Sequence, residues 1–275
     1  MRESRKPSAI LMGSKPGAVV ALETMLRRGW DIRYVIVSRP YAYPWVSGPS
    51  LEEYAVARGL PVGTQGQLPR TLKSDFVISY MYRNRVKNDV IAMAARAALN
   101  FHAGPLPEFG GWAFYNVAIL EDREEYGCTC HYMDENFDSG PLLRVRRFPI
   151  DARRETALSL ERRAQEEMVR LFVQFCELAE SGEDLPCEEQ DRAKMRYLTR
   201  EHFERLKKIP EGADRDAIDR IARAFWYPPY PCAYVETGGQ RVEVVPQIAK
   251  DEIATMFHRA DYERLRDVAE AEAGR

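Results

Sequence analysis

DFVISYMYRNRVKNDVIAMAARAALNFHAG, residues 75–104, contains two apolar runs with a helical pattern between them. Short apolar runs that alternate with helical segments are typical of βαβ units, so we expect a strand, a helix and a second strand over 75–82, 88–97 and 98–104. A βαβ unit joins parallel strands of one sheet. The second strand ends in polar residues, at the place where open parallel sheets bind their ligands.

The same alternation continues on both sides of this unit. Upstream, the patterns predict strands over 8–13, 31–38 and 60–63 and helices over 16–29 and 51–59. Downstream, they predict strands over 127–134 and 141–150, a helix over 113–121 and a long amphipathic helix over 155–180. Together these elements predict an α/β domain over residues 1–180 with a mostly parallel, doubly wound sheet.

The last third of the chain has a different pattern. Residues 181–210 are charged and poorly periodic, which is typical of a linker. Residues 211–275 combine a helix over 216–225, a segment rich in aromatic residues and proline over 226–236, and a strand over 241–248. We expect them to form a small C-terminal module that is β-rich and partly helical.

The composition of the 275 residues favours a soluble globular protein, with 45% hydrophobic and 30% charged residues. Forty basic and 42 acidic side chains give a net charge of −2, which argues against a nucleic-acid partner. The five cysteines lack a disulfide-rich spacing, which favours reduced thiols. Since no apolar run is long enough for a signal sequence or a membrane span, we expect a cytoplasmic protein without a membrane partner.

Asn100 and His102 are the first candidate catalytic residues. They lie two positions apart on a predicted strand, so their side chains point to the same side of the sheet. An amide can donate to a developing oxyanion, and an imidazole can take or relay a proton near neutral pH. The alternative is a hydrogen-bonded histidine at a strand end, which is the better interpretation of this pair taken alone.

Asp138 is the third candidate. It lies in the sequence FDSG, where Gly140 permits a tight turn and a close backbone approach to a ligand. Its carboxylate can hydrogen-bond an imidazole and stabilise the imidazolium form. The alternative is an Asx-turn residue, which taken by itself is the better interpretation.

Zinc binding is a further interpretation of the cysteine and histidine residues. Cys128, Cys130 and His131 could join His102 in a metal site. However, Cys128 and Cys130 share the strand face opposite to that of His131, and no second closely spaced pair completes four ligands. We therefore expect core thiols and no metal.

Candidate substrate-binding residues lie at both ends of the chain. Lys15 follows the first strand and could contact a diphosphate, although an ordinary surface lysine fits equally well. Trp226 and Tyr227 belong to an aromatic cluster that could stack on a nucleotide base, form a small core or make a dimer contact. The basic segment 191–208 could touch phosphate, but a solvated connector is the favoured interpretation.

Two segments carry a family resemblance: LNFHAGPLPEFGG, residues 99–111, and TCHYMDENFDSGPLL, residues 129–143. Together they resemble the signature of the 10-formyltetrahydrofolate-dependent formyltransferases, whose pattern is Asn-x-His, a Leu-Pro loop, His-x-Met-Asp and Asp-x-Gly. The resemblance covers roughly residues 8–180. It implies a Rossmann-like catalytic domain.

The resemblance also implies functional residues. Asn100, His102 and Asp138 match the catalytic positions of the family. The co-substrate 10-formyltetrahydrofolate would bind between two loops, at Met81, Tyr82 and Arg83 in the first and at Asp134 and Phe137 in the second. The family often has Ser at position 104 and Arg-Gly at positions 110–111, where this chain has Gly104 and Gly110-Gly111. These departures leave the catalytic trio intact and leave acceptor recognition open.

The tail decides between acceptors. IARAFWYPPYPCAYV, residues 221–235, resembles the ends of sugar-nucleotide N-formyltransferases, which implies a nucleotide-linked amino sugar as acceptor. The alternatives are hydroxyornithine and methionyl-tRNA formyltransferases, and a degenerate module that binds folate or a nucleotide sugar without turnover. We expect a homodimer, because the aromatic residues of the tail are too many for a hairpin alone to bury.

Overall fold

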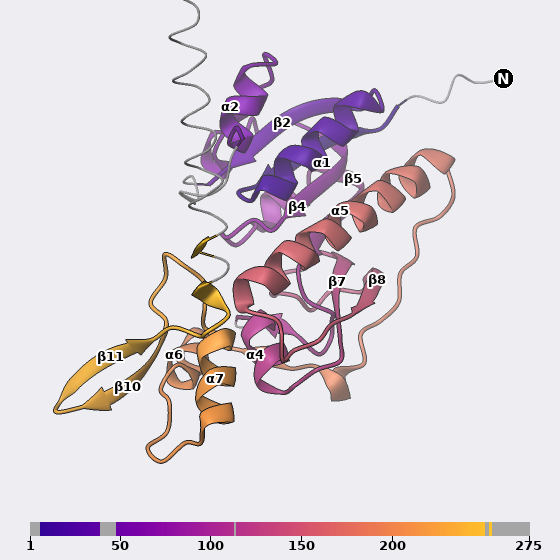
Figure 1. Ribbon diagram of the computed structural model, residues 1–275. Coiled ribbons are helices and arrows are strands. Elements are labelled where there is room, and N and C mark those ends of the chain that lie inside the picture. Colours follow the sequence, from indigo (N-terminus) through magenta and orange to yellow (C-terminus); the bar gives the residue numbers. More distant parts are fainter. Residues whose placement is uncertain (1–5, 39–47, 113, 251–252, 255–275) are drawn as a thin grey trace, which may run out of the picture.

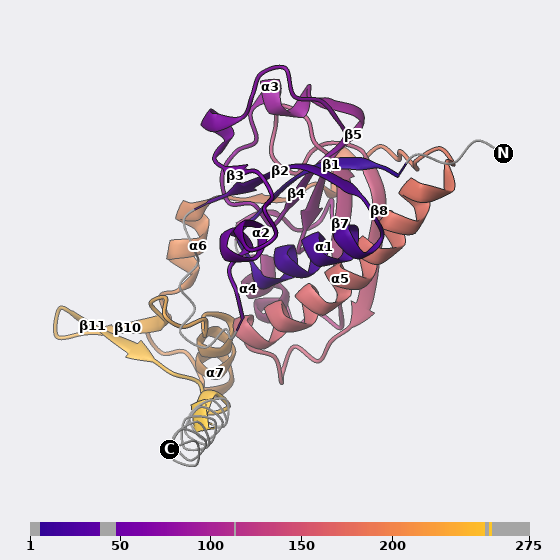
Figure 2. The same ribbon diagram turned by 90° about the horizontal axis from the view of Figure 1, so that it is seen from above.

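A computed structural model of the chain describes residues 6–38, 48–112, 114–250 and 253–254. Its centre is a seven-stranded sheet in the order β3-β2-β1-β4-β5-β7-β8 (Figures 1 and 2). The strands from β3 to β5 are parallel, whereas β5 pairs antiparallel with β7, and β7 with β8. The predicted α/β fold with a mostly parallel sheet is confirmed. The strands are β1 Ser8–Gly13, β2 Asp31–Val37, β3 Val62–Gly63, β4 Ser74–Tyr80, β5 Ala94–His102, β7 Glu125–Tyr132 and β8 Leu142–Pro149.

Two helices, α1 (Pro16–Arg27) and α5 (Ala157–Ser181), lie side by side on one face of the sheet (Figures 1 and 2). The buried residues of α5 recur every three or four positions, so one stripe of the helix faces the strands. Phe172 and Phe175 of this stripe pack against Phe101 of β5, with ring centroids 5.0 and 5.7 Å apart. The shorter helices of this part are α2 Leu51–Val56, α3 Asn88–Ile91 and α4 Phe114–Leu120.

The predicted helix over 88–97 is wrong in its extent. The helix α3 ends at Ile91, and β5 already begins at Ala94, four residues before the predicted start of the strand. Alanine favours helix, and the alanine-rich sequence therefore predicts one. Pairing with β4, in which Ala94 lies opposite Ser74, overrides this local preference.

The segment 181–210, which the sequence predicts as a linker, contains short elements that contact the end of the sheet. The strand β9 (Tyr197–Leu198) pairs in parallel with β6 (Gly110–Gly111), and it lies between the 3-10 turn η2 (Arg192–Lys194) and α6 (Arg200–Leu206). Strands of two residues leave no periodic signal in a sequence. The division of the chain at residues 180 and 210 stays a prediction.

The C-terminal module contains α7 (Arg215–Ala224) and a hairpin of β10 (Ala233–Thr237) and β11 (Gln240–Val244). The two strands project away from the sheet (Figure 1). Helix α7 packs against α4, and Asn116 of α4 donates a hydrogen bond of 2.6 Å to the carbonyl of Ala224. The predicted small module of helix and strands is confirmed.

Some sequence predictions fall outside the described residues. These are the first residue of the helix predicted over 113–121, and residues 251–252 and 255–275 of the predicted C-terminal module. Within the described part of the chain, no helix is long and apolar enough to cross a membrane.

Candidate active site

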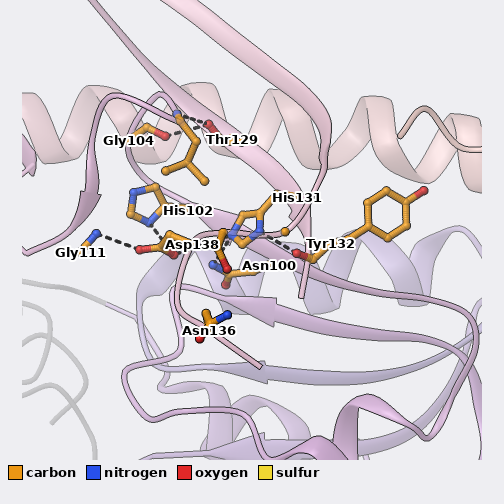
Figure 3. A network of polar contacts seen from close by, with 12 residues as sticks. Asn100, His102, Gly104, Gly111, Thr129, His131, Tyr132, Asn136 and Asp138 are labelled. Atoms are coloured by element: carbon orange, nitrogen blue, oxygen red, sulfur yellow. Dashed lines mark hydrogen bonds and ion pairs between the residues drawn. The ribbon is translucent and has the colours of Figure 1, made fainter. Parts of the chain in front are cut away.

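The three catalytic candidates meet at the carboxyl end of β5 (Figure 3). Asn100 and His102 belong to this strand, and Asp138 comes from the loop between β7 and β8. Because β7 runs antiparallel beside β5, the loop that follows β7 starts beside Asn100, which pairs with His131 of β7. The topology of the sheet thus brings together polar groups that are about forty residues apart in sequence.

His102 is buried, and its two ring nitrogens have different surroundings. Its Nε2 lies 2.7 Å from the carbonyl oxygen of Phe109. A carbonyl only accepts hydrogen bonds, so Nε2 carries a hydrogen. Its Nδ1 lies 3.6 Å from Oδ1 of Asp138. The Phe109 carbonyl therefore fixes the ring so that Nδ1 faces the carboxylate.

Asp138 is held by the loop that contains the glycine pair. Its Oδ2 accepts a hydrogen bond of 2.9 Å from the backbone N–H of Gly111. Its backbone has a φ of +55°, a left-handed conformation that is uncommon outside glycine. This conformation turns the carboxylate toward His102 and His131, whose Nε2 lies 3.7 Å from Oδ1.

His131 is a site residue whose role the sequence does not predict. Its Nδ1 donates to the carbonyl of Tyr132 at 2.8 Å, and its Nε2 lies 3.0 Å from Nδ2 of Asn100. Burial lowers the pKa of His131, although the charge of Asp138 opposes this effect. A neutral ring that donates through Nδ1 accepts at Nε2, so His131 fixes the orientation of the Asn100 amide. The signal for this role is the pairing of Asn100 with His131 across the strands, which requires knowledge of the register.

The thiols on the same strand are buried and protonated. Burial raises the pKa of Cys128 to about 12 and raises that of Cys130 well above its ordinary value. A thiol must lose its proton to bind zinc. Among the residues described by the structure, no group of three or more Cys, His, Asp or Glu side chains could hold a metal ion.

The predicted folate residues lie on two neighbouring loops, one after β4 and one after β7. Met81 has a φ of +49°, and its carbonyl accepts a hydrogen bond of 3.3 Å from Ser14. Arg85 donates to the carbonyl of Glu135, which links the first loop to the second. The arrangement leaves the backbone of both loops at the same edge of the sheet.

The side chains of these candidates differ in their contacts and in their exposure to solvent. Tyr82 is in reach of Gln65, whose Nε2 lies 3.4 Å from the tyrosine hydroxyl. The carboxylate of Asp134 accepts hydrogen bonds from Ser139 of its own loop, whereas Phe137 is 51% exposed. Arg83 lies near Lys15, where burial lowers the pKa of the lysine and the charge of Arg83 adds a smaller effect in the same direction.

Lys15 and Tyr227 lie together, although they come from opposite ends of the chain. Nζ of Lys15 donates to Oε1 of Glu161 at 2.7 Å and to the hydroxyl of Tyr227 at 2.9 Å. Burial lowers the pKa of Lys15, and the charge of Glu161 opposes this effect. The interpretation as an ordinary surface lysine is wrong, because Lys15 is only 7% exposed.

Among the described residues, Trp226 packs in a different place from Lys15 and Tyr227. It is 6% exposed and packs in a separate apolar cluster with Cys232 and Ala249. Tyr227 instead pairs with Tyr230, with ring centroids 5.7 Å apart. The two aromatic candidates of the tail therefore have different surroundings.

A cavity of about 170 Å³ lies at the carboxyl ends of β1 and β2. Ser14, Lys15 and Ser38 are among its lining residues, and so are Gly48 to Glu53. Because Ser14 also contacts Met81, the cavity adjoins the first of the two loops predicted to bind folate.

Comparison with known proteins identifies the family of the chain. Residues 64–176 match the family described as formyl transferase. A methionyl-tRNA formyltransferase of Marinobacter nauticus is 30% identical over 246 residues, which cover 86% of this chain and 78% of that protein. The chain belongs to the formyl transferase family. The family predicted from the two motifs is confirmed, and so is the prediction of an enzyme.

Other formyl transferases resemble this one. A GDP-perosamine N-formyltransferase of Brucella melitensis is 29% identical over 181 residues, which cover 63% of this chain and 65% of that protein. The crystal structure of an N-formyltransferase from Helicobacter canadensis superimposes with a TM-score of 0.71 at 22% identity, over 85% of each chain. This structural likeness confirms the fold.

Proposed function

We propose that this formyl transferase moves the formyl group of 10-formyltetrahydrofolate to the amine of a nucleotide-linked amino sugar. The convergence of Asn100, His102 and Asp138 at the end of β5 carries the proposal. An amide donor, an imidazole and a carboxylate at one point are the groups that acyl transfer to an amine requires.

The neutral amine attacks the formyl carbon. One N–H of Asn100 is engaged by His131, and we assign the other, with the protonated Nδ1 of His102, to the oxyanion that forms. Asp138 stabilises the imidazolium and helps to move a proton from the attacking nitrogen to the departing folate nitrogen. The new C–N bond forms to the sugar amine, the bond to N10 of folate breaks, and tetrahydrofolate leaves.

The folate would lie between the loops that contain Met81 to Arg83 and Asp134 to Asp138. Loop backbone groups that lack ladder partners can bind the pterin ring. The Helicobacter canadensis relative, a complex with folinic acid, supports a donor of the folate type. The mechanism assigns no step to a metal ion.

The amino-sugar acceptor is supported by two relatives. The Brucella melitensis protein is a GDP-perosamine N-formyltransferase, and the Helicobacter canadensis structure contains dTDP-3-aminofucose. The cavity beside Ser14 could take the nucleotide end of such a molecule. Tyr227 would lie near it, because its hydroxyl accepts a hydrogen bond from Lys15, which lines the cavity. Lys15 already forms an ion pair with Glu161, so its ammonium group would have to contact a diphosphate and Glu161 at the same time.

Methionyl-tRNA is the second candidate acceptor, because the Marinobacter nauticus relative has that activity in its name. The net charge of −2 disfavours it, since a polyanion is bound by an extended basic surface. Hydroxyornithine stays a third possibility from the sequence resemblance. A module that binds without turnover does not need the Asn, His and Asp groups to converge.

We also infer a cytoplasmic homodimer formed through the C-terminal module. Tyr230, Val242 and Val245 of this module are large apolar side chains that are 39%, 48% and 49% exposed, and a second copy would cover such side chains. Light scattering after gel filtration tests the dimer, and a mass of 31.6 kDa would contradict it.

The acceptor is tested with purified protein and 10-formyltetrahydrofolate. The acceptors are a panel of dTDP-, UDP- and GDP-linked amino sugars, methionyl-tRNA and hydroxyornithine, and the products are detected by mass spectrometry. We expect a mass increase of one formyl group on a nucleotide sugar. Formylation of methionyl-tRNA or hydroxyornithine alone would refute the proposed acceptor, and no turnover with any acceptor would refute the proposed function.

A further inference from the structure

Gln190 reaches from the segment after α5 into the loop that carries Asp138. Its Nε2 donates hydrogen bonds to two carbonyl oxygens, that of Asp138 at 2.9 Å and that of Gly140 at 2.8 Å. The residue is 7% exposed, and its Oε1 is buried without a hydrogen-bond partner among the described residues. Because both neighbours are carbonyls, which only accept, the amide serves this loop as a donor.

The turn that Gln190 holds has an unusual backbone. Asp138 has a φ of +55°, which costs free energy for a residue with a side chain. At Gly140, an added Cβ would lie 2.0 Å from the carbonyl oxygen of Tyr132, so the turn presses closely on β7. A strained turn persists only where the surrounding structure holds it in place. The two N–H groups of the neutral Gln190 amide provide this support.

The backbone on both sides of Gln190 is anchored independently of its side chain. Glu188 exchanges backbone hydrogen bonds of 2.6 and 2.9 Å with Leu142, and Gly110 donates to the carbonyl of Arg196 at 3.1 Å. The segment therefore does not need the Gln190 amide to stay in place. The side chain can be replaced while the path of the chain around it is kept.

We propose that Gln190 is a positioning residue for formyl transfer, which holds the Asp138 turn so that its carboxylate faces His102. The inference rests on the proposed function, because it assumes that Asp138 takes part in the reaction. Asp138 connects Gln190 directly to His102. Its carbonyl accepts a hydrogen bond from Gln190, and its Oδ1 lies 3.6 Å from Nδ1 of His102. A shift of about 1 Å in a catalytic group can lower a rate by about a hundredfold.

The first test is Gln190→Met, which keeps the volume of the side chain and removes both donors. We expect kcat to fall about ten- to a hundredfold while the KM values of donor and acceptor change by less than about threefold. Gln174→Met is the control, because Gln174 of α5 is half-buried and accepts only a weak bond of 3.4 Å from Arg144. Thermal unfolding shows whether both variants remain folded.

A double-mutant cycle separates positioning from a general structural role. In an Asp138→Asn background, Gln190→Met should lower kcat by less than about twofold, because the group that it positions is already gone. An equal loss of kcat in both backgrounds would overturn the inference. So would an unchanged kcat of Gln190→Met itself.

The same cycle distinguishes a failure of the inference from a failure of the proposed function. If Asp138→Asn alone keeps the wild-type kcat, the catalytic role of Asp138 is wrong and the inference falls with it. If Asp138→Asn is slow but the two losses multiply, only the role of Gln190 is wrong. Should Gln190→Met fail to fold, Gln190→Glu, which keeps the shape and removes the donors above pH 5, decides by the same comparison.

Discussion

Nδ1 of His102 lies 3.6 Å from Oδ1 of Asp138, while Nε2 of the same ring donates to a backbone carbonyl. Nε2 therefore anchors the ring to the backbone, and Nδ1 faces the candidate catalytic carboxylate. Since the carbonyl of Phe109 holds the hydrogen of Nε2, the proposed mechanism assigns proton exchange with a substrate to Nδ1. A substitution on the Phe109 side of the ring should therefore affect its orientation, and one on the Asp138 side should affect proton transfer.

Replacing His102 by Asn should lower kcat by about two to four orders of magnitude, because acid–base assistance is lost. The KM of each substrate should change much less. Steady-state kinetics with both substrates checks the effect, and His202→Asn, on an exposed turn of α6, is the control. Near-wild-type turnover of His102→Asn would remove His102 from the mechanism.

The lowered pKa of His131 predicts a loss of stability in acid. Burial keeps the folded ring neutral below its ordinary pKa of 6.5, whereas the unfolded chain takes up a proton there. Stability should therefore fall by up to about 1.4 kcal/mol for each pH unit between 6.5 and the lower folded pKa. Urea unfolding at several pH values measures this slope. In His131→Gln the slope should be smaller, and an equal slope in both proteins would show that His131 is not its source.

The two neighbouring aromatic residues of the tail should respond differently to substitution. Trp226→Ala should lower the free energy of unfolding by about 3 kcal/mol or more, because the ring is buried with Cys232 and Ala249. Tyr227→Ala should raise the KM of the acceptor about tenfold or more through lost stacking, and leave the KM of the folate donor unchanged. Tyr234→Ala, in the hairpin, is the control for the tail. If Tyr227→Ala leaves the acceptor KM unchanged, the tail has no part in binding.

Gly140→Ala should destabilise the protein by about 2–4 kcal/mol and abolish turnover, because the new Cβ would meet the carbonyl oxygen of Tyr132 at 2.0 Å. Gly182→Ala is the comparison. At Gly182 an added Cβ meets nothing within 4 Å, and only the φ of +81° is unfavourable, which costs about 1 kcal/mol. Chemical denaturation measures the free energy of unfolding of both variants and so separates the steric clash from the backbone preference. An equal loss of free energy in the two variants would contradict the close contact at Gly140.

The sequence predicts those parts of the fold that repeat a period over many residues. Helix α5 and the strand β1 lie where their patterns predict, because one face of α5 and all six residues of β1 are buried in the core. The start of β5 is different, since the alanines before Ala97 favour helix by themselves and become strand only through pairing with β4. Local preference gives no information about a partner strand.

The candidate site divides in the same way. Asn100 and His102 are two residues apart on one strand, so their shared side follows from the sequence alone. The contacts of Asn100 with His131 and of Asp138 with Gln190 depend on sheet register and on a turn with positive φ. Neither can be predicted from spacing, because the partners meet only after the chain has folded.

The pairing of β9 with β6 constrains how this enzyme can be recombined with its relatives. A chimera joined directly after α5 would exchange Gln190 and Tyr197–Leu198 along with the tail, and would thereby alter the support of the catalytic turn. A crossover after Leu206 keeps these residues with their own sheet and exchanges only α7 and the hairpin. Under the proposed function, acceptor preference should then move with the exchanged tail while the Asp138 turn keeps its support, provided that the new tail supplies a hydroxyl for Lys15 in place of that of Tyr227.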